Sequence, residues 1–484
     1  MTWKGRLWPG SDDPCPALIQ GGMGVGVSDW RLARAVAAAG QLGVVSGVAL
    51  DAVLARRLQC GDPGGDVRRA LGELPLPGVA ERIIRRYFVP GGIAAGQPFR
   101  PIPRPRLRPN VASAELTVAG NFVEAHLAKQ GHDGLVGINY LEKIQLATPA
   151  AVYGAMLAGV DYVLMGAGIP AEIPALLDSV AAGGPGEVTV TVAGAAAGTR
   201  HTVQLDPRTL FGVTPAALAR PRFLAIVSSA VLAAYLARTP ASTPDGFVLE
   251  TAGAGGHSAP PRGRLRLDAR NEPVYGPRDE IDVTKVAALG LPFWLAGGQA
   301  GPGRLARARA AGAAGIQVGT AFALCRESGL DAVLRRRLVE QALAGTLAIR
   351  NEARTSPAGF PFKVAQLSGT LAEDEVYAAR ARLCDLGYLR VPYQRGDGRI
   401  GYRCPAEPVE IYLRKGGAAE DTIGRRCLCN GLVATIGLAQ RRTGETAEPA
   451  LVTLGQDLSF LPELVAAAGV RFSAADVIAH LLRS

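Results

Sequence analysis

Short apolar segments rich in β-branched residues alternate with alanine-rich stretches of helical periodicity over roughly the first 325 residues. The apolar segments lack the alternation of half-exposed strands, which indicates strands buried on both faces of a parallel sheet. A helical stretch follows each of them, as at residues 28–40, where Ser28 or Asp29 can serve as the N-cap. The pattern predicts eight strands, at residues 16–22, 42–47, 134–141, 161–168, 223–229, 246–251, 292–298 and 315–322.

Eight strand–helix units favour a closed (β/α)8 barrel, or TIM barrel, over an open doubly wound sheet, which is the alternative. One helix is expected to begin with Thr148 as its cap and Pro149 at its first position. The active site of such a barrel lies at the carboxyl ends of its strands. The residues that follow each strand are therefore the candidates for chemistry.

Two segments interrupt the barrel pattern. Residues 60–112 include a stretch too rich in proline for a central strand, at 99–110, and are expected to form an insertion or a lid. Within residues 185–210, two alternating arms joined by small residues predict an inserted β-hairpin at 187–205.

The apolar pattern weakens beyond residue 325, where turn-rich sequence begins. The stretch 356–364 could bring Lys363 back over the barrel mouth. We expect a barrel over residues 1–330, a closing helix and linker over 331–359, and a cysteine-containing C-terminal α+β extension over 360–484.

Composition indicates a globular protein, because 48% of the 484 residues are hydrophobic and 19% are charged. The formal net charge is +10, but the arginines are scattered through helical patterns and form no stripe with aromatic residues, so we expect no nucleic-acid partner. Neither a signal peptide nor a long apolar run occurs, which predicts a soluble, cytoplasmic protein without a membrane role.

Seven cysteines in such a chain favour reduced thiols or a metal site over disulfides. Cys384, Cys404, Cys427 and Cys429 lie close together in the sequence and could hold zinc, but no C-x-x-C pair is present. We therefore expect buried thiols and no metal, with zinc as the alternative.

Glycine recurs where the predicted strands end, and there it allows a ligand to approach the backbone closely. The loops after the seventh and eighth strands form the usual phosphate site of this fold. The sequence therefore predicts a phosphate cradle at Gly297, Gly298, Gly319 and Thr320.

A single histidine follows the sixth strand, in LETAGAGGHSAPPRG at residues 249–263. It could face solvent, bind a metal or contact a substrate. No cysteine, aspartate or second histidine in the stretch completes a metal site, which leaves a solvent-facing loop or a contact with a substrate. The other histidines, His126, His132, His201 and His480, are expected to be structural.

Together, LIQGGMG, LGVVSG, AGGH, LAGGQ and GTAF resemble the nitronate monooxygenase family of FMN-dependent barrels, over about residues 14–330. GINYLEKIQLATPAAVYGAMLAGVDYVLMGAGIP at 137–170, and the tail motifs ARLCDLGYLR, GYRCPAEPVEIYLRKGG and GRRCLCNGL, resemble a branch that includes PfaD-like trans enoyl reductases of polyunsaturated fatty acid and polyketide synthesis. The sequence departs from the usual family pattern in SAPPRG, after the histidine.

The resemblance implies an FMN-dependent oxidoreductase with His257 as acid/base and Lys143 as a second catalytic candidate near the flavin or the substrate. Nitronate oxidation with O2 is the leading activity. The alternative is NAD(P)H-dependent reduction of an enoyl thioester on an acyl carrier protein, and a lesser one is a non-catalytic synthase partner. The oligomeric state, including a homodimer, is left open. The residues implied to contact the cofactor are Gln20, Gly21, Gly22, Met23, Asn139, Lys143, Gly255, Gly256, Ala296, Gly297, Gly298, Gly319 and Thr320.

Overall fold

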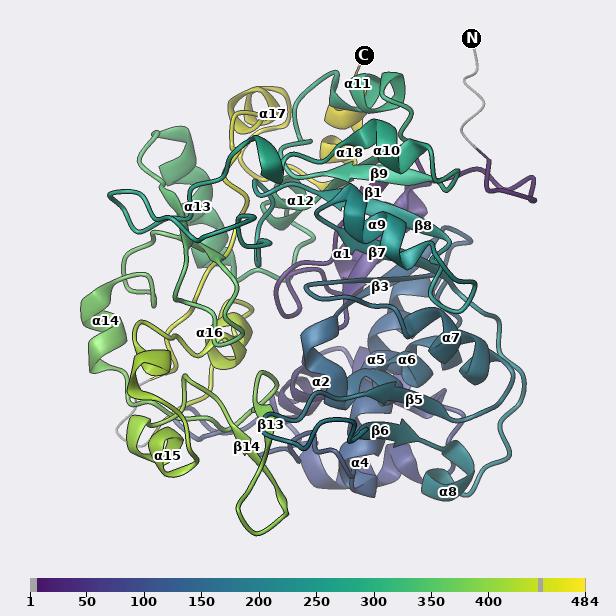
Figure 1. Ribbon diagram of the computed structural model, residues 1–484, viewed down its shortest axis with the longest axis vertical. Helices are drawn as coiled ribbons and strands as arrows, with labels where there is room; N and C mark the ends of the chain where they lie inside the picture. The colour runs from purple at the N-terminus through teal and green to yellow at the C-terminus, as the bar shows by residue number, and fades with distance from the viewer. Residues whose placement is uncertain (1–6, 443–446, 484) are drawn as a thin grey trace.

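Eight parallel strands close into a barrel in the computed structural model, which describes residues 7–442 and 447–483 (Figure 1). The barrel closes where β1 pairs with β10, and Gln20 lies opposite Val318 in that register. The predicted (β/α)8 barrel and all eight of its predicted strands are confirmed. The strands, in order around the barrel, are β1 (Leu18–Gln20), β10 (Gly315–Val318), β9 (Phe293–Ala296), β8 (Gly246–Glu250), β7 (Arg222–Val227), β4 (Tyr162–Gly166), β3 (Val136–Leu141) and β2 (Leu42–Ser46).

Large side chains fill the amino-terminal half of the barrel. Trp8 lies against Tyr162 and Trp294, and its indole N–H donates to the Tyr162 hydroxyl at 3.1 Å. The indole of Trp294 donates to the carbonyl of Pro16 at 2.8 Å. Inward positions recur every second residue along a strand, so the residues two positions beyond this packed layer face the open, carboxyl-terminal end.

Helices surround the barrel. Asp29 caps α1, since its carboxylate accepts from the backbone N–H groups of Arg31 and Leu32. Thr148 is instead the first residue of α6, because a 3-10 helix, η1 (Glu142–Ala147), leads straight into it; the predicted cap at Thr148 is wrong. The helices of this layer are α1 (Trp30–Ala38), α2 (Leu50–Gln59), α5 (Val111–Lys129), α6 (Thr148–Leu157), α7 (Ile173–Ala181), α9 (Ala230–Leu236), α10 (Val283–Ala287), α11 (Arg304–Ala310) and α12 (Thr320–Ala323), with η2 (Pro277–Asp279) before α10.

The predicted insertions are folded segments on the outside of the barrel. The first contains α3 (Asp66–Gly72) and α4 (Val79–Tyr87), which pack against α2 and α5. The second is the predicted hairpin, β5 (Gly186–Thr189) paired antiparallel with β6 (Thr202–Leu205), followed by α8 (Pro207–Phe211).

The chain beyond α12 lies beside the barrel and returns to its outer layer at the end, where α18 packs against α1, α11 and α12 (Figure 1). None of the helices among residues 7–442 and 447–483 is long and apolar enough to cross a membrane. The elements of this part are α13 (Ala332–Leu343), β11 (Ile349–Glu352), β12 (Phe362–Ala365), α14 (Asp374–Ala379), β13 (Val391–Gln394), β14 (Ile400–Arg403), α15 (Val409–Arg414), η3 (Ala419–Thr422), α16 (Leu428–Ala434), α17 (Leu461–Ala468) and α18 (Ala474–Leu482).

The cysteines of the C-terminal part are free thiols. Cys384 and Cys404 share a hydrogen bond, which lowers the pKa of Cys384 and raises that of Cys404. Within the part of the chain that the structure describes, no three cysteine, histidine or acidic side chains gather as a metal site would require. The structure therefore offers no support for the zinc alternative.

The C-terminal part is joined to the barrel layer by buried polar contacts. The Tyr388 hydroxyl donates a short hydrogen bond to Asp51 at the start of α2, where both residues are buried. Gln440 forms two hydrogen bonds with the backbone of Phe99, accepting from its N–H at 2.8 Å and donating to its carbonyl at 3.1 Å. These contacts tie the proline-rich stretch to the C-terminal part.

We predict that Tyr388→Phe lowers the free energy of unfolding by about 1–3 kcal/mol, because Asp51 stays buried and keeps only backbone N–H groups, such as that of Ala52, as donors. Urea denaturation measures the change. Tyr377→Phe is the matched control, since the Tyr377 ring stacks on Arg426 and the phenyl ring preserves that contact. Equal stability of Tyr388→Phe and the wild type would contradict the role given to this contact.

Candidate functional site

A cavity of about 510 Å³ opens at the carboxyl end of the barrel. Its volume falls in the range of small-molecule and cofactor sites. Residues at or just beyond the ends of all eight strands line it, and the C-terminal part adds Phe360, Phe362 and the segment 452–455. No residue of the segment 60–112, which is described throughout, lines this cavity, so the structure gives the lid alternative no support.

Close contacts require glycine at two positions of the cavity wall. A Cβ atom at Gly22 would lie 2.4 Å from the Cβ of Asn139. Gly297 has φ +86°, and a Cβ there would lie 2.3 Å from Thr251 Oγ1. Both glycines keep the wall flat against the cavity.

Most of the predicted site residues lie together on this wall. Gly319 lies beside Met23, whose sulfur would be 3.4 Å from a Cβ built at that glycine. The predicted residues that line the cavity are Gly21, Gly22, Met23, Asn139, Gly255, Gly256, His257, Ala296, Gly297, Gly298, Gly319 and Thr320.

Gln20 lies behind the wall, fully buried, and is not a lining residue. Its amide nitrogen donates to the Gly21 carbonyl at 2.5 Å and to the Ser28 hydroxyl at 2.9 Å, and its amide oxygen accepts from Val44 N–H. It therefore fixes the loop after β1 and does not face the cavity.

Lys143 also lies outside the cavity. Its ammonium group lies 3.0 Å from the centre of the Phe360 ring and 3.5 Å from the carbonyl of Ala358. Burial lowers the pKa of Lys143 to about 8. Because Phe360 does line the cavity, Lys143 supports the wall from behind.

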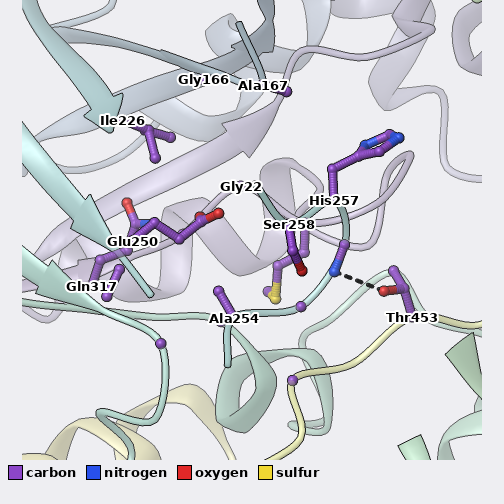
Figure 2. A pocket seen from close by; sticks show the side chains of 18 of the residues that line it. Gly22, Gly166, Ala167, Ile226, Glu250, Ala254, His257, Ser258, Gln317 and Thr453 are labelled. Atoms are coloured by element: carbon purple, nitrogen blue, oxygen red, sulfur yellow. Dashed lines mark hydrogen bonds between the residues drawn. The ribbon is translucent and has the colours of Figure 1, made fainter. Parts of the chain in front are cut away.

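His257 projects from the loop after β8 at one side of the cavity (Figure 2). Its Nε2 lies 2.7 Å from the Ser356 hydroxyl, and the rings of Phe360 and Phe362 meet the imidazole edge-on. Burial, with a smaller contribution from the charge of Lys143, lowers the pKa of His257 to about 3. The imidazole is therefore neutral at physiological pH.

Strand β12 forms hydrogen bonds with the loop that carries His257. The backbone N–H of Lys363 donates to the Gly256 carbonyl, and that of Ser258 donates to Pro361, both at 2.9 Å. The fully buried ammonium of Lys363 donates to the Ser258 hydroxyl at 2.7 Å and to the Ala252 carbonyl. From the other side, Gly256 N–H donates to the Thr453 hydroxyl at 2.8 Å (Figure 2). The stretch 356–364 thus brings Lys363 to the loop after β8, but Lys363 does not line the cavity.

Sequence reasoning missed several residues of this site. Glu250 and Gln317 line the cavity from the ends of β8 and β10. Glu250 could have been identified from sequence, because it is an acidic residue at the carboxyl end of a buried strand. Ala167, which also lines the cavity, has φ +56°, an unusual conformation for a residue other than glycine. Ser356 and Thr453 carried no signal, since only the folded chain brings Ser356 to His257 and Thr453 to Gly256.

Residues 215–360 match the sequence model of a family described as nitronate monooxygenase. The matched segment contains β7 to β10, the His257 loop and Phe360. The resemblance to the nitronate monooxygenase family is thus confirmed over residues 215–360, and this segment is similar to a family of oxidoreductases. No curated protein sequence matches the chain.

Solved structures with a similar arrangement are distant. FabK from Thermotoga maritima is 16% identical, with 96% of this chain and 91% of that chain covered and a TM-score of 0.45. A nitroalkane oxidase from Streptomyces ansochromogenes is 17% identical, with 96% and 94% covered and a TM-score of 0.39. The enoyl reductase domain of MlnA, from the macrolactin biosynthesis cluster of Bacillus amyloliquefaciens, is 12% identical, with 73% and 64% covered and a TM-score of 0.39. We draw no functional conclusion from similarities at this level.

We predict that the proton NMR signal of the His257 ring does not titrate between about pH 5 and about pH 9, because desolvation keeps the imidazole neutral over that range. The variant His257→Asn identifies the signal. A titration step near pH 6.5, the ordinary value for histidine, would show that the ring is solvated and would contradict the described packing.

Proposed function

We propose that this protein is an FMN-dependent oxidoreductase that oxidises alkyl nitronates with O2. The observation that carries the proposal is the glycine-lined cavity at the barrel mouth, with a neutral histidine held beside it. The family match over residues 215–360 supports the same class of chemistry.

The cavity residues fit a flat, phosphorylated cofactor. Gly297, Gly298, Gly319 and Thr320 would hold the phosphate, because loops after the last two strands of such a barrel present backbone N–H groups to anions. Gly21, Gly22, Met23 and Asn139 would face the ring, at a wall where a Cβ on Gly22 leaves no room. The Asp457 carboxylate, which accepts hydrogen bonds from Ser459, lies near Gly298. Its negative charge would weaken phosphate binding there.

When bound, FMN would accept electrons from the substrate and pass them to O2. A nitronate has already lost the proton from its carbon, so the site needs no strong base to form it. His257 enters the reaction neutral, able to accept a proton and to hydrogen-bond the substrate. Arg262 lines the cavity with an exposed side chain and would attract the anionic substrate.

The second candidate is NAD(P)H-dependent reduction of an enoyl thioester delivered by a carrier protein. Ile169, which lines the cavity and is 56% exposed, favours it, as does Leu232 on the same wall. An apolar wall that reaches solvent suits an acyl chain whose far end stays outside the protein.

We predict that Gly297→Ala weakens FMN binding by at least about tenfold, because the added Cβ collides with Thr251 and displaces the wall. Fluorescence titration with FMN measures the dissociation constant. Gly290→Ala is the matched control, since Gly290 has a similar φ of +78° but no atom within 4 Å of its Cβ position. Equal FMN affinity of the two variants would contradict the proposed cofactor wall.

We predict that the FMN-loaded protein consumes O2 with propionate 3-nitronate in the absence of NADPH, and that His257→Asn lowers kcat by about 100-fold while FMN stays bound. An oxygen electrode measures the rate. A protein that takes up no FMN would overturn the proposal. A protein inert to the nitronate but active with NADPH and an enoyl thioester would favour the second candidate.

A further inference from the structure

Glu250 is an acidic side chain inside the cavity that the chemistry above does not use. It is the last residue of β8 and lines the cavity, toward which its side chain extends from the strand end (Figure 2). Its carboxyl group accepts no hydrogen bond from any residue that the structure describes. Glu250 is half-buried, and a carboxylate at a cavity wall that offers it no protein donor is expected to carry a proton or to meet a ligand.

Gln317 also has an acceptor oxygen without a donor, and it lies at the same level of the barrel as Glu250. Glu250 lies opposite Ala296 in the β8–β9 register, and Ala296 lies opposite Gln317 in the β9–β10 register. The amide oxygen of Gln317 is buried and has no partner among the described residues. Two acceptors without donors therefore face one part of the cavity, where a ligand with N–H or O–H groups would satisfy them.

The charged groups around Glu250 come from other elements. Lys363, on β12, is the charge that acts on it, while Arg262 and Asp457 line the same cavity. The neighbouring strands present Ile226 and Ala296, which are apolar. Burial raises the pKa of Glu250 to about 7 even though Lys363 opposes the shift. Such a carboxyl group exchanges its proton readily near neutral pH.

His257 differs from Glu250, because it begins neutral and can only accept a proton. Its Nε2 is occupied by the Ser356 hydroxyl, and its imidazole stays neutral. Of these two groups, His257 is held by a hydrogen bond, and Glu250 faces the cavity without one.

We propose that Glu250 is a second proton-transferring residue of this site, which releases its proton as the bound cofactor gains electrons and recovers it on reoxidation. The O–H bond of the carboxyl group breaks and its electron pair stays on the carboxylate, where the ammonium of Lys363 stabilises the charge. The proton would pass to the reduced cofactor and would return to Glu250 when O2 reoxidises that cofactor. The nitronate is the reductant and O2 the oxidant, so Glu250 is unchanged over one turnover. This inference rests on the proposed function.

The experiment compares wild type, Glu250→Gln and Glu250→Asp, all loaded with FMN. Glutamine has the same shape but cannot ionise, so kcat for nitronate oxidation should fall by about 10- to 100-fold and its pH dependence near neutrality should disappear. Aspartate should restore part of kcat and the pH dependence. The dissociation constant of FMN should change by less than about threefold in Glu250→Gln. An unchanged pH profile, or a loss of FMN in Glu250→Gln, would overturn the proposal.

A second measurement needs no activity. Infrared difference spectra of the wild-type protein between about pH 5.5 and about pH 8.5 should show a protonated carboxyl band that titrates near neutrality. The band should vanish in Glu250→Gln and persist in Asp457→Asn, in which a different cavity carboxylate is removed. Absence of the band from the wild type would overturn the inference. If the band is present but the protein oxidises no nitronate, the proposed function fails while the ionisation of Glu250 stands.

Discussion

The loop after β8 lies between the barrel and the C-terminal part of the chain, and the site depends on how this loop is held. Strand β12 pairs with it through the backbone, and the buried ammonium of Lys363 bonds both its start, at Ala252, and its far side, at Ser258. Burial lowers the pKa of Lys363 to about 8, so hydrogen bonds must compensate a costly charge. The loop conformation that brings His257 to the cavity is therefore specified by residues more than a hundred positions away.

The barrel alone does not enclose the cavity, because the C-terminal part of the chain forms one of its sides. The strands and their glycines supply a flat floor and wall, but Phe360, Phe362 and the segment 452–455 close the opposite side. Outside the cavity, Lys143 contacts Phe360 and so links the two parts, while Gln20 fixes the loop after β1 within the barrel. The C-terminal part thus acts as a component of the site.

The barrel could be predicted because local sequence marks each buried parallel strand. Each strand is a short apolar run, and a helix with recognisable capping residues follows it. Thr148 misled the cap prediction, since Thr148 is itself helical and a 3-10 turn occupies the preceding residues. The choice between insertion and lid for residues 60–112 could not be made from sequence, because it depends on contacts with distant residues such as Gln440.

The glycines of the site were predictable from their position after strands. Ser356 and Thr453 were not, since nothing local marks a hydroxyl that meets a loop far away in the sequence. The domain boundaries at 330 and 360 and the roles of the site residues stay predictions.

The central claim is that this cavity holds FMN and passes electrons to it from a nitronate. The most direct test is the visible spectrum of the FMN-loaded protein under anaerobic conditions, with the nitronate and NADPH added separately. Our account predicts that the nitronate bleaches the flavin absorbance, that admitted O2 restores it, and that NADPH alone leaves it unchanged. Bleaching by NADPH with no response to the nitronate would contradict it.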